Sequence, residues 1–416
     1  MNAGLYSAFD DVLMLEAVRT PWCDYGGALG LVSPTDLGIK VGREVLRRAE
    51  IDPAAVDSVL AGCVAQASFD AYMLPRHIGL YSGVPQAVPA LGVQRICGTG
   101  FELLRQAGEQ LKAGGAELAL CVAAESMSRN PIAAYTHRGG FRLGAGVEFK
   151  DFLWEALFDP AADIDMIGTA ENLARRYGVF REEADAYALR SFELALAAQN
   201  EGVFAGEIVS VHSESFALDG YQPRSIALPR GVESLEQDSH PRPTSLAALS
   251  RLRAIHAGGV QTAGNSCAVV DGAAAALVAS ASAAAGRRPL ARLLATAVVG
   301  VAPEFMGIGP APAIRLLLER SGLRLDDIAR FEINEAQAAQ VLAVQRELQL
   351  DPQRLNQQGG SIALGHPLAA TGLRLALSLA RQLRAANQRY GIAAACIGGG
   401  QGMAVLIENP AFARAE

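Results

Sequence analysis

Two stretches of the chain repeat the same order of hydrophobic and polar positions. Residues 43–64 and residues 314–336 each read as an amphipathic helix, a short break, an acidic turn and an apolar strand. Ile51 of the first stretch corresponds to Leu323 of the second. Apolar residues at helical spacing indicate a helix face, and short apolar runs indicate buried strands. The repeated order predicts a duplicated α/β architecture with largely parallel strands.

Each repeat is followed by a second shared pattern. Residues 96–126 and residues 363–400 both contain a glycine-rich loop with a reactive side chain, then a helix, then an apolar strand. Cys97 lies in the first loop and His366 in the second. A chance likeness of two generic strand–helix units is the alternative, but the shared order of four elements favours duplication.

The segment between the halves, residues 129–261, breaks this pattern. It is richer in charge, and residues 169–200 have apolar positions at helical spacing, which predicts one strong helix. We interpret the segment as an inserted, partly loop-like subdomain of the kind that often covers an active site.

Composition excludes several classes of protein. The 416 residues include 36 Lys and Arg against 43 Asp and Glu, a formal charge of −7, which argues against a nucleic-acid binder. Half of the residues are hydrophobic, so the chain can bury a large core of two to three domains. The beginning of the chain does not read as a signal peptide, and no apolar run is long enough to span a membrane.

The six cysteines are scattered and form no C-x-x-C motif. Neither a zinc site nor a disulfide scaffold is favoured, so we expect reduced thiols in a cytoplasmic protein and no metal.

Cys97 stands where an apolar stretch meets a predicted helix, between residues that include Gly98 and Gly100. The N–H groups and dipole of a helix start favour the thiolate, so we expect a lowered pKa and a nucleophile. A buried structural thiol is the alternative interpretation.

His366 stands between a glycine and a proline on a tight loop before a helix. Such an imidazole can act as a base toward a nearby thiol, although a structural, hydrogen-bonded histidine fits the residues equally well.

Cys396 ends an apolar strand before three glycines, Gly398 to Gly400, and a second apolar strand. It is either an inert thiol in a tight turn or a second reactive thiol beside N–H groups that form an oxyanion hole. Asn334 ends another strand, where it is either a functional group or a helix N-cap, or both.

These loops together resemble the thiolase family. The motifs run along nearly the whole chain: CGTG around Cys97, NEAQA around Asn334, GHP around His366 and CIGGG around Cys396. The resemblance implies a five-layered α/β/α/β/α fold built from two halves with an inserted loop domain. It places the first half at residues 1–128 and 262–286, the insertion at 129–261 and the second half at 287–416.

The resemblance also implies a role for each residue of the site. His366 takes the proton of Cys97, and the thiolate attacks an acyl-CoA to form an acyl thioester. Cys396 then removes the α-proton of acetyl-CoA. His366 and a water held by Asn334 stabilise the enolate, and the N–H groups of Cys97 and Gly398 hold the tetrahedral oxyanion.

Substrate contacts follow from the same resemblance. The pantetheine arm or acyl group is expected against Met166, Ala263, Cys267, Ala336 and Gln337. Arg242 is a candidate for a phosphate of coenzyme A, although a solvated loop arginine is an equal alternative. The chain departs from the family pattern at Cys267 and Ala268, usually Ser and Gly, at Gln337, usually aromatic, and in the loop at residues 67–76.

The resemblance therefore implies an acyl-CoA C-acyltransferase that makes or cleaves 3-ketoacyl-CoA. Coenzyme A and acyl-CoA are substrates, and no cofactor is permanently bound. It further implies a homodimer or homotetramer in fatty acid metabolism, such as β-oxidation. From the cysteines, the charge and the hydropathy we expect a cytoplasmic protein with no nucleic-acid or membrane partner. The alternatives are a related condensing enzyme with an unusual acyl substrate and a weakly active CoA-binding scaffold subunit.

Overall fold

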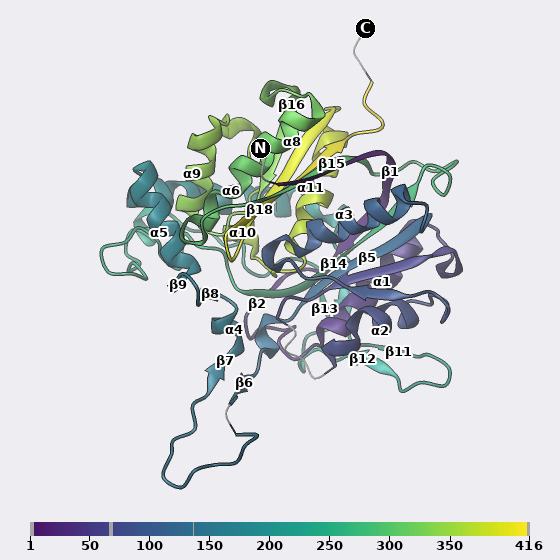
Figure 1. Cartoon of the computed structure of the whole chain (residues 1–416), viewed down its shortest axis with the longest axis horizontal. Helices are drawn as coiled ribbons and strands as arrows, with labels where there is room; N and C mark the ends of the chain where they lie inside the picture. Colours follow the sequence, from purple (N-terminus) through teal and green to yellow (C-terminus); the bar gives the residue numbers. More distant parts are fainter. Residues whose placement is uncertain (1–3, 66–69, 136, 414–416) are drawn as a thin grey trace.

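A computed structural model describes residues 4–65, 70–135 and 137–413. A ten-stranded mixed sheet runs through this part of the chain in the order β16-β17-β18-β15-β1-β14-β5-β3-β4, and β2 pairs with β14 (Figure 1). The strands are β1 (Leu5–Arg19), β2 (Cys23–Asp24), β3 (Ser58–Gly62), β4 (Ala90–Gly92), β5 (Leu118–Glu125), β14 (Val270–Ser280), β15 (Ala291–Gly300), β16 (Ile328–Ile333), β17 (Tyr390–Ile397) and β18 (Gln401–Glu408).

Strand β1 joins the two halves of this sheet. It pairs with β15 of the second half and, over its later residues, with β14 of the first half. The register shifts between Ala8 and Val12 on one side and between Met14 and Glu16 on the other. Bulges of this kind bend a strand, so one long strand can serve two differently oriented halves.

Helices divide the fold into five layers. Helices α1 (Pro34–Arg48) and α2 (Leu74–Tyr81) cover the first half of the sheet, and α8 (Pro310–Ser321) covers the second half, beside α9 (Ala338–Leu348). Helices α3 (Thr99–Lys112) and α11 (Thr371–Ala385) pack against each other between the halves (Figure 1). The order helix, sheet, helix, sheet, helix confirms the expected five-layered fold.

The residues of β14 show why helices cover both of its faces. Ala274, Ala276 and Val278 belong to the core that contains α3 and α11, whereas Ala275 and Leu277 belong to the core beneath α1. Successive residues of a strand point to opposite faces, so a strand that is apolar throughout needs a layer on each side.

The expectation of largely parallel strands is wrong. Among the strands that the structure describes in the large sheet, β3 pairs in parallel with β4 and β5, β16 pairs in parallel with β17, and the other pairings are antiparallel. The reason is visible between β17 and β18, where the short connection at Gly398–Gly400 leaves no room for the crossover that parallel neighbours require.

The internal repeat is confirmed in its elements. In the first half α1 is followed by a 3-10 turn, Pro53–Ala55, and by β3. In the second half α8 is followed by a 3-10 turn, Leu325–Asp327, and by β16.

The segment at residues 129–261 contains two long helices rather than the single one predicted. Helix α5 (Met166–Tyr177) ends at Gly178, whose φ of 62° is left-handed, and α6 starts after Phe180 (Arg181–Asn200). A glycine at this position commonly ends a helix, and the periodicity alone did not reveal it.

Short elements make up the rest of this segment. A pair of strands, β6 and β7, projects from the body (Figure 1). No helix in the described ranges is long and apolar enough to cross a membrane. The short elements are β6 (Ile132–Ala133), β7 (Lys150–Asp151), α4 (Phe152–Glu155), β8 (Phe158–Asp159), β9 (Ile164–Asp165), β10 (Val211–His212), β11 (Glu214–Phe216), β12 (Arg224–Ile226), β13 (Ser234–Leu235) and α7 (Leu246–Leu249).

Candidate active site

The loop that carries Cys97 connects β4 to helix α3. Cys97 lies in a 3-10 turn, Ile96–Gly98, and α3 starts at the next residue. Ile96 has a φ of 46°, a conformation that costs a β-branched residue on the order of 1–3 kcal/mol. Strain at the residue before a thiol indicates that the loop is shaped to position the thiol.

Burial dominates the chemistry of the Cys97 thiol. It raises the pKa of Cys97 to about 11, although the N–H groups of Gly398 and Cys97 itself face the sulfur and act in the opposite direction. The expectation that the helix start lowers this pKa is wrong, because loss of hydration outweighs the nearby N–H groups. Cys97 therefore rests as a neutral thiol and needs a base.

His366 lies in the loop before helix α11, and its ring is held at both nitrogens. Nδ1 is 2.6 Å from Oγ1 of Thr371, and Nε2 is 3.3 Å from Nδ2 of Asn334. Burial, helped by the positive charge of Arg374, lowers the pKa of His366 to about 3. The imidazole is therefore neutral at neutral pH and can accept a proton.

Asn334 follows strand β16 and is completely buried. Ser361 donates a hydrogen bond of 2.6 Å to Oδ1 of Asn334, which leaves the amide nitrogen facing His366. Helix α9 starts at Ala338 with Gln337 in the N-cap position, so Asn334 is not a helix cap.

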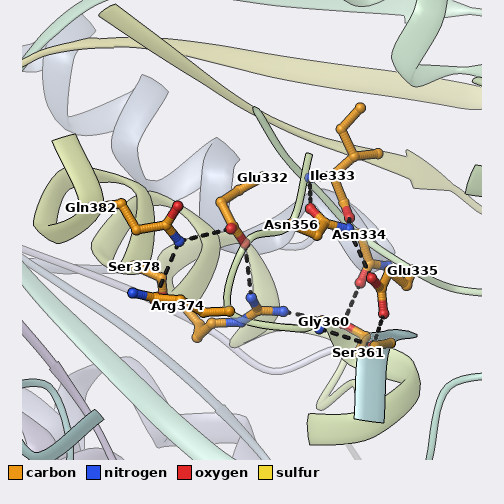
Figure 2. A network of polar contacts seen from close by, with 12 residues as sticks. Glu332, Ile333, Asn334, Glu335, Asn356, Gly360, Ser361, Arg374, Ser378 and Gln382 are labelled. Carbon is orange, nitrogen blue, oxygen red and sulfur yellow. Dashed lines mark hydrogen bonds and ion pairs between the residues drawn. The ribbon is translucent and has the colours of Figure 1, made fainter. Parts of the chain in front are cut away.

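A buried ion pair supports Ser361. Arg374 lies 3.3 Å from Glu332 and donates to Ser361 at 3.2 Å, and Gln382 donates to Glu332 at 2.8 Å. Figure 2 shows Arg374 between Glu332 and Ser361. Both charged side chains are 1% exposed, and burial raises the pKa of Glu332 to about 7 although Arg374 opposes the shift.

The end of β16 is fastened on its other side by Asn356 and Glu335 (Figure 2). The Asn356 amide pairs with both the N–H and the carbonyl of Ile333 and donates to Glu335. Glu335 also accepts hydrogen bonds from Tyr187 and Ser191 of helix α6. The segment at residues 129–261 thus holds the strand that presents Asn334.

Glu125, at the end of β5, connects the loops of the two halves. Its buried carboxylate accepts hydrogen bonds of 3.1 Å from the N–H groups of Val64, Ala65 and Ala369. Ala369 belongs to the loop of His366, so this carboxylate ties that loop to the first half. Burial raises the pKa of Glu125.

Cys396 lies near the end of β17 and has no exposed surface. The turn that follows requires glycine, since Gly399 and Gly400 have φ values of 78° and 83°. Burial raises the pKa of Cys396 well above its usual value, and the neighbouring sulfurs of Cys97 and Cys267 act in the same direction. The second thiol is therefore also neutral and lies beside the first.

A cavity of about 680 Å³ opens onto these groups. Cys97 and His366 line it, and its wall is mostly apolar. Cys396 packs against Met166, Met306 and Ala336, which line the same cavity. A space of this size and character suits a small-molecule substrate with an apolar part.

The expected substrate contacts divide into two groups. The cavity wall includes all but one of them: Met166, Ala263, Cys267, Ala336 and Gln337. Arg242 lies outside the wall, where it contacts His240 and stacks over Phe192. Among the described residues no group of three His, Cys, Asp or Glu side chains could hold a metal ion. The departure in the loop at 67–76 lies partly outside the described residues, at 67–69.

The sequence analysis missed the residues that support the site: Thr371, Ser361, Arg374, Glu332 and Glu125. Thr371 and Arg374 stand five and eight positions after His366, at the start of the helix that follows it. A hydroxyl and a cation in an otherwise apolar helix start were the available signal.

Comparisons with known proteins cover almost the whole chain. Two family models match, described as "Thiolase, N-terminal domain" at residues 12–282 and "Thiolase, C-terminal domain" at residues 287–409. The chain is 40% identical over 404 residues to the mitochondrial 3-ketoacyl-CoA thiolase of Bos taurus. The alignment covers 96% of this chain and 98% of the relative. It is 39% identical to the 3-oxoadipyl-CoA/3-oxo-5,6-dehydrosuberyl-CoA thiolase of Escherichia coli strain K12. This alignment covers 96% of this chain and 99% of the relative. Among solved structures, human mitochondrial 3-ketoacyl-CoA thiolase matches with a TM-score of 0.92 at 39% identity, covering 97% of this chain and 100% of that one. The structure of the human enzyme in complex with CoA matches with a TM-score of 0.90 at 39% identity. The match covers 96% of this chain and 98% of that one.

Proposed function

The chain belongs to the thiolase family and is an acyl-CoA acyltransferase, and we propose that it makes or cleaves 3-ketoacyl-CoA through an acyl thioester on Cys97. The observation that carries this proposal is the meeting of Cys97 and His366 at one apolar cavity, with Cys396 packed directly behind its wall. A buried thiol beside a neutral imidazole is suited to nucleophilic attack on a thioester.

The first half-reaction loads Cys97. His366 accepts the thiol proton as the sulfur attacks the carbonyl carbon of an acyl-CoA. The carbon–sulfur bond to coenzyme A then breaks, and the departing thiolate takes the proton back from His366. The raised pKa of Cys97 and the lowered pKa of His366 support transfer during the attack rather than a standing thiolate–imidazolium pair.

The second half-reaction forms or breaks the carbon–carbon bond. Cys396 first gives its thiol proton to His366, and the Cys396 thiolate then takes a proton from the α-carbon of acetyl-CoA. The resulting enolate attacks the acyl carbonyl on Cys97. The bond to Cys97 breaks, the Cys97 thiolate takes the proton from His366, and 3-ketoacyl-CoA leaves. In reverse, Cys97 attacks the 3-keto carbon, Cys396 protonates the departing enolate, and CoA releases the acyl group.

Two sets of donors stabilise the negative charge that develops on oxygen. His366, once it carries the Cys396 proton on Nε2, donates to the enolate together with a water held by Asn334. The N–H groups of Cys97 and Gly398 serve the tetrahedral intermediate, and their influence on the Cys97 sulfur supports this assignment. Removal of one such donor typically lowers the rate by about 10²–10³.

Thiolysis of acetoacetyl-CoA by CoA, followed as loss of the 3-ketoacyl absorbance, tests the proposed reaction. Mass spectrometry of protein mixed with acetyl-CoA tests the intermediate, which should appear as an acetyl group on the peptide that contains Cys97. Cys97→Ala should lose both the turnover and the label. A label that survives this change would show that another residue is the nucleophile.

The acyl substrates, the setting and the assembly are further parts of the proposal. The names of the relatives, which include 3-ketoacyl-CoA and 3-oxoadipyl-CoA thiolases, support a 3-ketoacyl-CoA substrate. We propose that this substrate belongs to fatty acid metabolism such as β-oxidation. Thiolysis rates across chains of increasing length and with carboxylate ends test this range. Coenzyme A enters as substrate, and the site needs no resident cofactor. The free cysteines support a cytoplasmic location, which imaging of a tagged chain tests.

We propose a homodimer or homotetramer on the basis of exposed apolar side chains. The segment that includes β6 and β7 exposes Ile132, Tyr135, Phe141, Leu143 and Phe149, all at least 60% accessible. Patches of this kind usually mark contacts with another chain. Sedimentation of the purified protein tests the number of copies.

A further inference from the structure

The hydrogen bonds around His366 form one connected series of buried side chains. Arg374 donates to Ser361 at 3.2 Å, and Ser361 donates to Oδ1 of Asn334 at 2.6 Å. Nδ2 of Asn334 meets Nε2 of His366 at 3.3 Å, and Nδ1 of His366 meets Oγ1 of Thr371 at 2.6 Å. Every one of these side chains is 3% exposed or less.

The Arg374 end of this series of hydrogen bonds sets its direction as far as Asn334, and the hydrogen bond from Thr371 to Pro367 agrees with that direction. A guanidinium can only donate, so Ser361 accepts from Arg374 and its own hydrogen points to Oδ1 of Asn334. The Asn334 amide must then present its N–H₂ group to His366. At the other end the Thr371 hydroxyl donates to the carbonyl of Pro367 at 3.0 Å, and a carbonyl can only accept.

We propose that Thr371 and Ser361 are positioning residues that hold His366 in the tautomer with hydrogen on Nδ1 and a free lone pair on Nε2. Nδ1–H donates to the Thr371 oxygen, and Nε2 accepts from Asn334. The inference rests on the proposed role of His366 as the base for Cys97, because only a bare Nε2 can take that proton on the side where Asn334 lies.

The opposite tautomer leaves groups without partners. A hydrogen on Nε2 would face the N–H₂ group of Asn334, two donors against each other. Rotating the amide by 180° would remove that clash but turn N–H₂ toward Ser361. Ser361 would then accept from both Arg374 and Asn334, and its own hydrogen would lose its acceptor. Buried donors without acceptors cost free energy, so this series of hydrogen bonds selects one tautomer of His366.

The same series of hydrogen bonds affects how long His366 keeps the proton that it takes from Cys97. After His366 takes the Cys97 proton, both of its nitrogens carry hydrogen, and Nε2–H faces the Asn334 donor. The imidazolium is then poorly accommodated and returns its proton to the departing thiolate of coenzyme A. Thr371 and Ser361 thus make His366 a base that receives and releases its proton at one nitrogen.

A matched pair of variants tests the role of Thr371. Thr371→Val keeps the shape but removes the oxygen that accepts from Nδ1–H, whereas Thr371→Ser keeps the hydroxyl. Nitrogen-15 NMR of protein labelled at its histidines, with the His366 signals assigned from the spectrum of His366→Asn, reports the tautomer directly. We expect Nδ1–H signals in the parent and in Thr371→Ser, and a mixed or reversed tautomer in Thr371→Val.

Kinetics provide the second measurement. The kcat for acetoacetyl-CoA thiolysis should fall by about tenfold or more in Thr371→Val, with a smaller change in KM, and should recover in Thr371→Ser. Because NMR needs no turnover, a parent protein that shows the Nδ1–H tautomer but no thiolysis would refute the proposed function and leave this inference standing. Parent signals of the Nε2–H tautomer, or an unchanged tautomer and kcat in Thr371→Val, would overturn the inference.

If Thr371→Val does not fold, Ser361→Ala tests the other end of the series of hydrogen bonds. Loss of the Ser361 hydroxyl frees the Asn334 amide to turn, so we expect the same shift in tautomer and the same fall in kcat. Ser361→Thr, which keeps a hydroxyl, is its control. An unaltered His366 tautomer in Ser361→Ala would contradict the proposed role of Ser361.

Discussion

Gly100 and Gly372 touch each other through their backbones. A Cβ atom on Gly100 would lie 2.9 Å from the Cα of Gly372 and 2.5 Å from the N of Leu373. A Cβ atom on Gly372 would lie 2.5 Å from the N of Phe101. Gly100 follows Cys97 on helix α3, and Gly372 follows His366 on helix α11. The close approach of these two helices therefore sets how the nucleophile of one half meets the base of the other.

Gly100→Ala should destabilise the protein and reduce its activity. The new methyl group meets backbone atoms that cannot move aside, and overpacking of this kind costs about 1–3 kcal/mol. Denaturant unfolding should show this loss in the free energy of unfolding. Gly139→Ala is the control, since no atom lies within 4 Å of its added Cβ. Equal stability of both variants would show that the helices can separate without cost.

Alkylation of Cys97 should be slow at neutral pH and rise steeply above it. Iodoacetamide reacts with the thiolate, and burial raises the pKa of Cys97 to about 11, so the thiolate fraction increases about tenfold per pH unit from pH 7 to pH 10. Mass spectrometry of the Cys97 peptide measures the rate in the absence of acyl-CoA, with Cys97→Ala as the blank. A rate that levels off below pH 9 would instead indicate a thiolate paired with protonated His366.

The sequence predicted which loops meet but not how their groups titrate. Short motifs of glycine and polar residues can be recognised from the sequence alone, and they contain Cys97, His366, Asn334 and Cys396. The pKa of Cys97 depends on how much water the folded loop excludes, and its direction was predicted wrongly. The sequence analysis missed the residues that support His366, because Ser361 and Arg374 act through hydrogen bonds between segments that are brought together only in the fold. The pairing of β1 with strands of both halves depends on bulges that no local pattern indicated.

Cys396→Ser should separate the two half-reactions. A hydroxyl is a far weaker acid–base group than a thiol here, so acetylation of Cys97 by acetyl-CoA should persist while α-proton exchange falls by about 10²-fold or more. Deuterium uptake into acetyl-CoA measures the exchange. Cys121→Ser is the control, because the Cys121 thiol donates a hydrogen bond to the carbonyl of Leu103 that a hydroxyl preserves. Undiminished exchange in Cys396→Ser would assign the base elsewhere.

A buried ion pair fastens the segment at residues 129–261 to strand β1. Arg19, at the end of β1, is completely buried and donates to both carboxylate oxygens of Asp238, at 2.6 and 2.9 Å, and to Glu207 at 2.7 Å. Asp238 also accepts from the N–H of Trp22 at 2.8 Å. Asp238 and Glu207 both belong to the segment at 129–261, so this cluster decides whether that segment stays in place beside the cavity.

Asp238→Ala should lower the free energy of unfolding by about 3–5 kcal/mol, because it leaves the Arg19 charge buried with a single carboxylate partner. Calorimetry or denaturant unfolding measures the loss. Asp326→Ala is the matched control: this aspartate is 78% exposed, its ion pairs lie in solvent, and its loss should change stability by less than about 1 kcal/mol.

Because the segment also supplies Tyr187 and Ser191 to Glu335 beside Asn334, we expect Asp238→Ala to raise the KM for acyl-CoA even below its unfolding temperature. A large loss of stability with unchanged kinetics would show that the ion pair supports the fold alone.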